Sequence, residues 1–127
     1  MLGHLSFGVA DLARSSAFYD AVMGALGFAR VFTAAHAVGY GRAGTNNDRL
    51  LLIQSEPVIP PGPGFHLAFN APSRPAVDRF HAAALRFGGI DEGAPGLRPH
   101  YGADYYAAFV LDPDGYKLEA KHPPADA

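Results

Sequence analysis

The chain has 127 residues, and 49% of them are hydrophobic, so it can bury one compact core but is too short for two independent domains. Its formal net charge is −2, and it has no run of basic residues that would bind nucleic acid. It also has no segment of about 18 consecutive apolar residues, so no contact with a membrane is expected. The lack of cysteine excludes disulfides and thiolate chemistry, and a charged fraction of only 17% leaves room for a contact between two copies, so we expect a cytoplasmic homodimer.

The first half of the chain shows one strand, one helix and three more strands. Residues 4–10 alternate large apolar side chains with small or polar ones, which predicts a half-buried strand and leaves no room for a signal peptide before it. Asp11 is a typical helix N-cap and Gly27 a typical helix stop, so a helix is expected between them. Three short strands are then expected, over residues 28–33, 36–42 and 49–55. These elements predict a βαβββ module over about residues 1–56.

The second half begins in the same way after a break. Residues 57–64 contain four prolines and two glycines, which cannot form a regular ladder and therefore predict a linker. A strand follows, then a helix that Ser73 would cap and that would end at Gly88 and Gly89. Two later strands, over residues 105–111 and 116–121, are joined by the tight turn Asp112-Pro113-Asp114-Gly115. This second module covers about residues 65–123.

The two halves are also similar in sequence. Without gaps, His4 aligns with His66, an offset of 62 residues (66 minus 4). The same offset aligns Leu5 with Leu67, Phe7 with Phe69, Phe18 with Phe80 and Gly27 with Gly89. A period of this length is typical of a duplicated supersecondary module rather than of a solenoid. We therefore predict one α+β domain in which two tandem βαβββ modules form a curved, cupped mixed sheet, with the helices on its convex face.

Three side chains on these strands could bind a metal ion. His4 and His66 each open a strand whose large apolar residues lie on the other face, and that other face must pack against the helices. The same alternation puts Glu119, on the last strand, on the face without helices. If a pseudo-twofold axis relates the modules, the two imidazoles and the carboxylate converge on the concave face of the sheet.

Two imidazoles and one carboxylate form a facial triad that leaves coordination positions open for water, oxygen or substrate. Such a triad suits Fe, Mn, Zn or Ni. A single histidine on a strand is more often a surface or hydrogen-bonded residue than a ligand, but the repeated placement favours the metal site. We predict a divalent metal ion bound by His4, His66 and Glu119.

Three segments resemble a known family. They are His-Leu-Ser-Phe-Gly-Val-Ala-Asp-Leu at the start, Gly-Phe-His-Leu-Ala-Phe in the middle, and Phe-Val-Leu-Asp-Pro-Asp-Gly-Tyr-Lys-Leu-Glu-Ala near the end. Nearly the whole chain resembles the vicinal oxygen chelate superfamily, which includes glyoxalase I, fosfomycin resistance thiol transferases, extradiol dioxygenases and bleomycin-binding proteins. The last segment is the most specific of the three.

The resemblance implies a function in one of two classes. In metal-dependent members that look like this chain, the ligands correspond to His4, His66 and Glu119, and a site is in some members shared between two subunits. A metal-dependent enzyme of the lyase, isomerase, thiol transferase or dioxygenase type, acting on a small oxygen-chelating substrate, is therefore one expectation. The alternative is a metal-free protein of the same fold that sequesters a small molecule or drug.

The sequence departs from glyoxalase I at the end of the first module. For an enzyme of that type, the resemblance implies four metal ligands, one of which is a further glutamate at the end of the first module. Aligning Pro57 with Pro123 puts Ile53 opposite Glu119, and Ile53 can neither bind metal nor accept a proton. A gapless alignment brings Glu56 near this position instead. The choice depends on where the strand ends, and we favour Ile53.

Other polar residues are candidates for contact with substrate. His100, Tyr101 and Tyr106, with Tyr105 beside them, are expected near the mouth of the cavity, where they could orient substrate or act as general acids and bases. Together with Glu119 they form the predicted catalytic set. Packing is the simpler interpretation for each tyrosine. Several basic strand residues, including Arg42, Arg49 and Lys117, could counter an anionic substrate, although solvated strand charges are the simpler interpretation.

Overall fold

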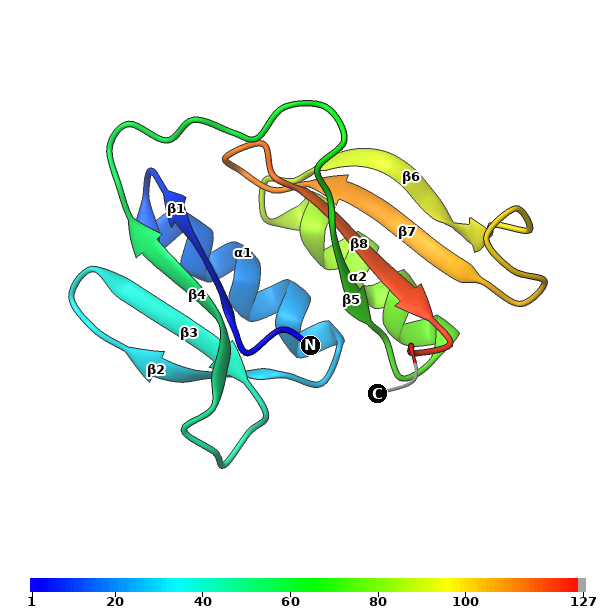
Figure 1. Cartoon of the computed structure of the whole chain (residues 1–127), viewed down its shortest axis with the longest axis horizontal. Helices are drawn as coiled ribbons and strands as arrows, with labels where there is room; N and C mark the ends of the chain where they lie inside the picture. Colours follow the sequence, from blue (N-terminus) through cyan, green and yellow to red (C-terminus); the bar gives the residue numbers. More distant parts are fainter. Residues whose placement is uncertain (126–127) are drawn as a thin grey trace.

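The computed structural model describes residues 1–125 and contains the βαβββ arrangement twice (Figure 1). The first module consists of β1 (Leu5–Val9), α1 (Leu12–Ala25), β2 (Ala29–Thr33), β3 (Ala37–Gly41) and β4 (Asp48–Gln54). The second module consists of β5 (Leu67–Asn70), α2 (Arg74–Arg86), β6 (Ile90–Leu97), β7 (Tyr106–Leu111) and β8 (Lys117–His122). No helix among the described residues is long and apolar enough to cross a membrane.

Each module forms its own four-stranded mixed sheet. The strand orders are β1-β4-β3-β2 and β5-β8-β7-β6, and in both sheets the outermost first strand pairs in parallel with the last one. The predicted α+β fold is confirmed, with one refinement: no ladder joins β1 to β5, so the cup consists of two sheets whose edges face each other across a gap (Figure 1).

The local signals that define the helices are those expected from the sequence. The Asp11 side chain accepts a hydrogen bond from the amide of Arg14, and the Ser73 side chain accepts one from the amide of Ala76. Gly27 and Gly88 follow the two helices with φ angles of 90° and 98°, a left-handed conformation that glycine adopts without strain. Short polar caps and glycine stops therefore set the helix boundaries.

Strand β6 was not located by the sequence pattern. Its sequence, Ile-Asp-Glu-Gly-Ala-Pro-Gly-Leu, has no apolar alternation, and its pairing with β7 is interrupted between Asp91 and Gly93 and again between Gly93 and Gly96. Pro95 is tolerated because β6 pairs on one side only, as the outer edge of its sheet. Tertiary pairing with β7, rather than local preference, makes this segment a strand.

The two modules pack helix against helix. Phe18 and Val22 of α1 and Phe80 and Ala84 of α2 are fully buried, and they belong to one hydrophobic cluster that extends under both sheets. Glycine is required at position 89, where an added Cβ would lie 3.0 Å from the Phe18 ring and 2.8 Å from the carbonyl oxygen of Ala84. A single core therefore spans both modules.

The turn between β7 and β8 joins the second module to the first. The buried Asp112 carboxylate accepts a hydrogen bond of 2.6 Å from the Tyr19 hydroxyl of α1 and others from the amides of Asp114 and Tyr116. Burial raises the pKa of Asp112, and these hydrogen bonds partly offset that effect. We call Asp112–Gly115, with Tyr116, the docking turn.

Asp114 of the docking turn caps the start of α1 from the other module. Its carboxylate accepts hydrogen bonds from the Ala10 amide at 3.2 Å, the Arg14 guanidinium at 3.0 Å and the Ser15 hydroxyl at 3.2 Å. The first turn of α1 has no acidic residue, so Asp114 adds its negative charge to that of the Asp11 cap at this helix N-terminus. The hydroxyl of Tyr116 also donates to the Gly8 carbonyl of β1 at 2.7 Å.

We expect Tyr19→Phe to lower the free energy of unfolding by about 1–3 kcal/mol, because it leaves one oxygen of the buried Asp112 without its donor. Urea unfolding measures this change. Tyr106→Phe is the matched control: it removes the same hydroxyl from a bond of 2.6 Å to Asp78 at an exposed site, and should cost less than about 1 kcal/mol. Equal losses in both variants would show that the docking turn contributes nothing special to stability.

Candidate functional site

The open face of the second sheet, which no helix covers, carries a histidine–carboxylate pair. Nε2 of His66, just before β5, lies 3.0 Å from Oε1 of Glu119 on β8. The ladder places Glu119 beside Ala68, two residues after His66 and on the same face of the sheet. The parallel pairing of β5 with β8 therefore brings together two side chains that are far apart in the sequence.

Glu119 is buried although it lies on the open face, with an exposed fraction of 2%. Its second oxygen, Oε2, accepts a hydrogen bond of 2.6 Å from the hydroxyl of Tyr105. Both carboxylate oxygens thus have a partner, while His66 itself remains exposed. Burial, followed by the hydrogen bond to Glu119, raises the pKa of Tyr105, so the phenol keeps its proton at neutral pH.

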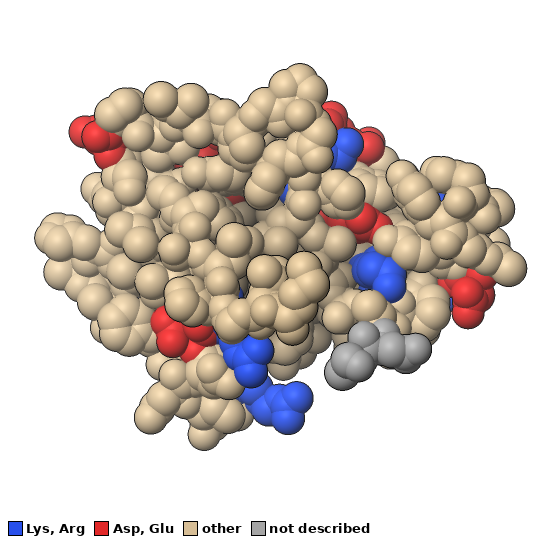
Figure 2. Space-filling view, viewed as in Figure 1, with Lys and Arg blue, Asp and Glu red and all other residues tan. Residues whose placement is uncertain are grey.

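Cationic side chains and aromatic rings surround the pair. The Lys121 ammonium lies 5.1 Å from the ring centre of Tyr105, and Lys117 and Arg98 lie 5.5 Å and 5.6 Å from that of Phe109. Charged side chains of both signs are visible over β8, on a face that is otherwise largely uncharged (Figure 2). These rings and charges would suit a small anionic or aromatic ligand.

An aromatic series leads from the loop after β6 toward Glu119. The rings of His100 and Tyr101 have centres 4.1 Å apart, and those of Tyr101 and Tyr105 are 5.3 Å apart. His100 and Tyr101 are exposed, whereas Tyr105 reaches the buried carboxylate. Two of the predicted residues therefore lie at the rim of the site.

Tyr106 does not lie with them. Neighbouring residues on a strand face opposite sides, and the Tyr106 hydroxyl donates a hydrogen bond of 2.6 Å to Asp78 on α2, on the helix side of the sheet. The phenol beside Glu119 is that of Tyr105. The sequence named both Tyr105 and Tyr106 as candidates, but only the phase of β7 decides which of the two faces Glu119.

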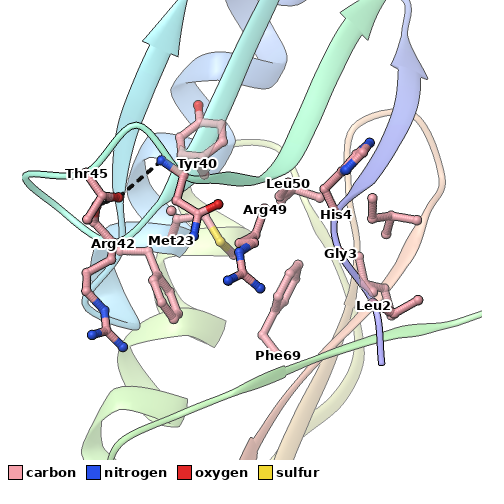
Figure 3. Close-up of a pocket in the computed structure, with 15 residues that line it drawn as sticks. Leu2, Gly3, His4, Met23, Tyr40, Arg42, Thr45, Arg49, Leu50 and Phe69 are labelled. Carbon is pink, nitrogen blue, oxygen red and sulfur yellow. Dashed lines mark hydrogen bonds between the residues drawn. The ribbon is translucent and has the colours of Figure 1, made fainter.

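His4 lies apart from this pair within the chain. In Figure 1, β1 and β5 run in opposite directions, so the residues before β1 and those before β5 lie at opposite ends of the gap between the sheets. His4 instead borders a cavity between the two modules, and its ring points away from the centre of that cavity (Figure 3). Among residues 1–125 of one chain, no three His, Cys, Asp or Glu side chains are close enough to hold a metal ion. One chain assembles two of the three predicted ligands, and the three-ligand site stays a prediction.

The strand ladders correct the residue that corresponds to Glu119 in the first module. Ala68, two residues after His66, pairs with Glu119, whereas Ser6, two residues after His4, pairs with Leu51. Leu51 therefore takes this position, and not Ile53. The proline-based alignment was wrong because the segments between these positions and the two prolines differ in length. The chemical conclusion is unchanged, since Leu51 is also unable to bind metal or accept a proton.

The His66–Glu119 pair fits a metal ion as well as a hydrogen bond. Two donor atoms about 2 Å from one ion lie close to each other, as Nε2 and Oε1 do at 3.0 Å. The hydrogen bond from Tyr105 to the other oxygen is the kind of partner that orients a ligating carboxylate. Without a metal, the same atoms form an ion pair whenever His66 is protonated.

Two residues near Glu119 were outside the predicted catalytic set. Arg98, directly after β6, lies over Phe109, and Tyr105, which the sequence named only as a neighbour of that set, contacts Glu119 directly. Arg98 could not be placed because β6 gave no strand pattern. Tyr105 could have been chosen over Tyr106 by its phase, since it is an even number of residues from Phe109, which faces Glu119 across the β7–β8 ladder.

Comparisons with known proteins agree with this fold. Residues 1–120 match the family model described as the Glyoxalase/Bleomycin resistance protein/Dioxygenase superfamily. A solved glyoxalase/bleomycin resistance protein from Albidiferax ferrireducens T118 is 33% identical, with a TM-score of 0.81, over 96% of this chain and 98% of that one. No curated protein matches the chain.

More distant structures share the fold alone. A glyoxalase-related enzyme from Fulvimarina pelagi is 23% identical, with a TM-score of 0.72, over 95% of this chain and 86% of that one. A variant of glyoxalase I from Zea mays is 22% identical, also with a TM-score of 0.72, and this chain covers 45% of its length.

We expect Tyr105→Phe to lower the free energy of unfolding by about 1–3 kcal/mol, because it leaves Oε2 of the buried Glu119 without a donor. Thermal or urea unfolding measures the loss. The control is Tyr101→Phe, which removes a hydroxyl from a ring that is 61% exposed, and should change stability by less than about 0.5 kcal/mol. If Tyr105→Phe left the free energy of unfolding unchanged, the hydrogen bond from Tyr105 would not be what stabilises the buried Glu119 carboxylate.

Proposed function

Because the chain belongs to the glyoxalase/bleomycin resistance protein/dioxygenase superfamily, we propose that it is a metal-dependent enzyme acting on a small oxygen-bearing substrate. The observation that carries the proposal is the His66–Glu119 pair, a nitrogen and an oxygen donor 3.0 Å apart on an open sheet face. The Glu119 carboxylate is 2% exposed and both of its oxygens have a hydrogen-bond partner, so its position is fixed, as a metal ligand requires.

The third ligand is proposed to be His4 of a second copy. In one chain His4 and His66 lie at opposite ends of the gap, so a shared site would bring His4 of one copy to the His66 and Glu119 of the other. The exposed apolar residues Phe32 and Ile53, which are 45% and 39% exposed, give the first sheet a surface that a second copy would cover. A twofold dimer of this kind has two equal sites.

The residues of this chain would divide the work as follows. A bound divalent metal ion supplies Lewis acidity, which stabilises negative charge on a substrate oxygen. Lys117, Lys121 and Arg98 attract and orient an anionic substrate, and Phe109 provides an apolar surface for it. Tyr105 holds Glu119 in place and keeps its own proton near the site. Leu51, where a second carboxylate would stand, argues against proton shuttling of the glyoxalase I type.

Metal analysis of the purified protein tests the proposal. We expect close to one bound divalent ion per chain in the wild type, and a loss of about tenfold or more in His66→Ala and Glu119→Gln, because each removes one of few ligands. His36→Ala is the control, since His36 is exposed and its ring makes no hydrogen bond among the described residues. A wild type without metal that still binds small aromatic anions would favour the sequestering protein instead.

Mixed dimers test whether the site is shared. His4→Ala and His66→Ala copies should each lose metal, and an equal mixture of the two, refolded together, should regain about a quarter of the wild-type content. Half of the dimers are then mixed, and each mixed dimer has one intact site. No recovery in the mixture, or full metal content in His4→Ala alone, would contradict the shared site.

A further inference from the structure

A cavity of about 610 Å³ opens between the two modules at the end opposite the docking turn (Figure 3). Its walls include neither His66 nor Glu119 nor Tyr105, so it is separate from the pair described above.

The cavity exists because the duplication is imperfect. At one end of the helix pair, the docking turn inserts its side chains between the modules. The corresponding β3–β4 loop at the other end makes only local hydrogen bonds, from Thr45 to the Arg42 carbonyl and from the Asn47 amide to Thr45. With no insertion from this loop, the space between the modules stays open.

The floor of the cavity is apolar. Leu5, Met23 and Leu50 line it from the first module, and Leu67 and Phe69 line it from the second. Tyr40 presents only its ring, because its hydroxyl is already bonded to Asp20 and to the Ser16 carbonyl. An apolar group would therefore be buried here by both modules at once.

Two arginines complete the lining. Figure 3 shows Arg49 directed toward the centre of the cavity and Arg42 at its outer side. Within residues 1–125, neither guanidinium forms an ion pair or a side-chain hydrogen bond. Of the six other arginines, three have such a partner among the described residues: Arg14 and Arg30 are paired with aspartates, and Arg98 donates to the Ala94 carbonyl.

We propose that this cavity binds a small amphipathic carboxylate, with its apolar part between Leu50, Leu67 and Phe69, its carboxylate on Arg49, and Arg42 adding positive charge at the outer side. The argument is charge complementarity next to an apolar cavity, because a guanidinium matches a carboxylate with two parallel hydrogen bonds. A volume within the usual range for small-molecule sites and few polar groups at one side are typical of such pockets. The proposal does not depend on the metal site.

Calorimetric titration of the full-length protein with decanoate, in the presence of a metal chelator, tests the proposal. We expect saturable binding of one decanoate per chain, and binding at least about tenfold weaker for decanol, which keeps the chain but lacks the charge. The double variant Arg42→Gln/Arg49→Gln should weaken decanoate binding by roughly tenfold to a hundredfold and leave decanol unchanged.

The matched control is Arg79→Gln/Arg86→Gln on α2, which removes the same charge from two exposed arginines outside the cavity and should bind decanoate as the wild type does. Leu67→Trp, which fills the cavity, should abolish binding while an unfolding curve shows that it still folds. No binding to the wild type, equal weakening in both double variants, or unchanged binding in Leu67→Trp would overturn the proposal. A second copy that fills the cavity would be seen as decanoate binding that disappears as protein concentration rises, which would also overturn it.

Discussion

Beside the shared helix-to-helix core, the second module is joined to the first by one buried polar contact, between Asp112 of the docking turn and Tyr19 of α1. A carboxylate that is 2% exposed needs all its acceptor sites engaged, and the turn itself supplies two backbone amides while the other module supplies the hydroxyl. Asp114, next to it, receives three more donors from the start of α1. The Asp-Pro-Asp-Gly segment, which resembled the family most specifically, is therefore a structural joint between modules, and Glu119 follows it at a fixed distance along β8.

This joint exists at one end of the helix pair only, so the two ends differ in packing. At the joined end the helices and sheets are closely packed. At the other end the β3–β4 loop leaves a cavity lined by both modules, with His4 at its border. The two histidines occupy equivalent positions in the repeat, but the approximate twofold relation reverses the direction of β1 with respect to β5 and so separates them. A duplicated sequence thus produces two chemically different regions: a histidine–carboxylate pair on one face and an apolar, arginine-bordered cavity on the other.

Local physics explains why much of the fold could be predicted. Asp11 and Ser73 each precede an apolar helical stripe and cap the helix that follows. Gly27 and Gly88 adopt positive φ angles where the helices end. The alternation of apolar and polar residues assigns one face of β1, β5 and β8 to the core. Strand β6 was not predicted because its residues have no preference for strand structure of their own; it is a strand because it pairs with β7. Residue type alone cannot distinguish Tyr105 from Tyr106, because both carry a phenol. The phase of β7 distinguishes them: the hydroxyl of Tyr106 donates to Asp78, and that of Tyr105 donates to Glu119.

The sequence alone determined the duplicated βαβββ plan, the helix ends, the closing turn and the face on which His66 and Glu119 lie, because each of these depends on residues near one another or on a simple period. Only the tertiary structure decided what depends on register and on the relation between modules. The ladders put Leu51, rather than Ile53, at the position equivalent to Glu119, and the opposed directions of β1 and β5 keep His4 from the other two predicted ligands in one chain. Such contacts join residues that are distant in sequence, so no local pattern can specify them.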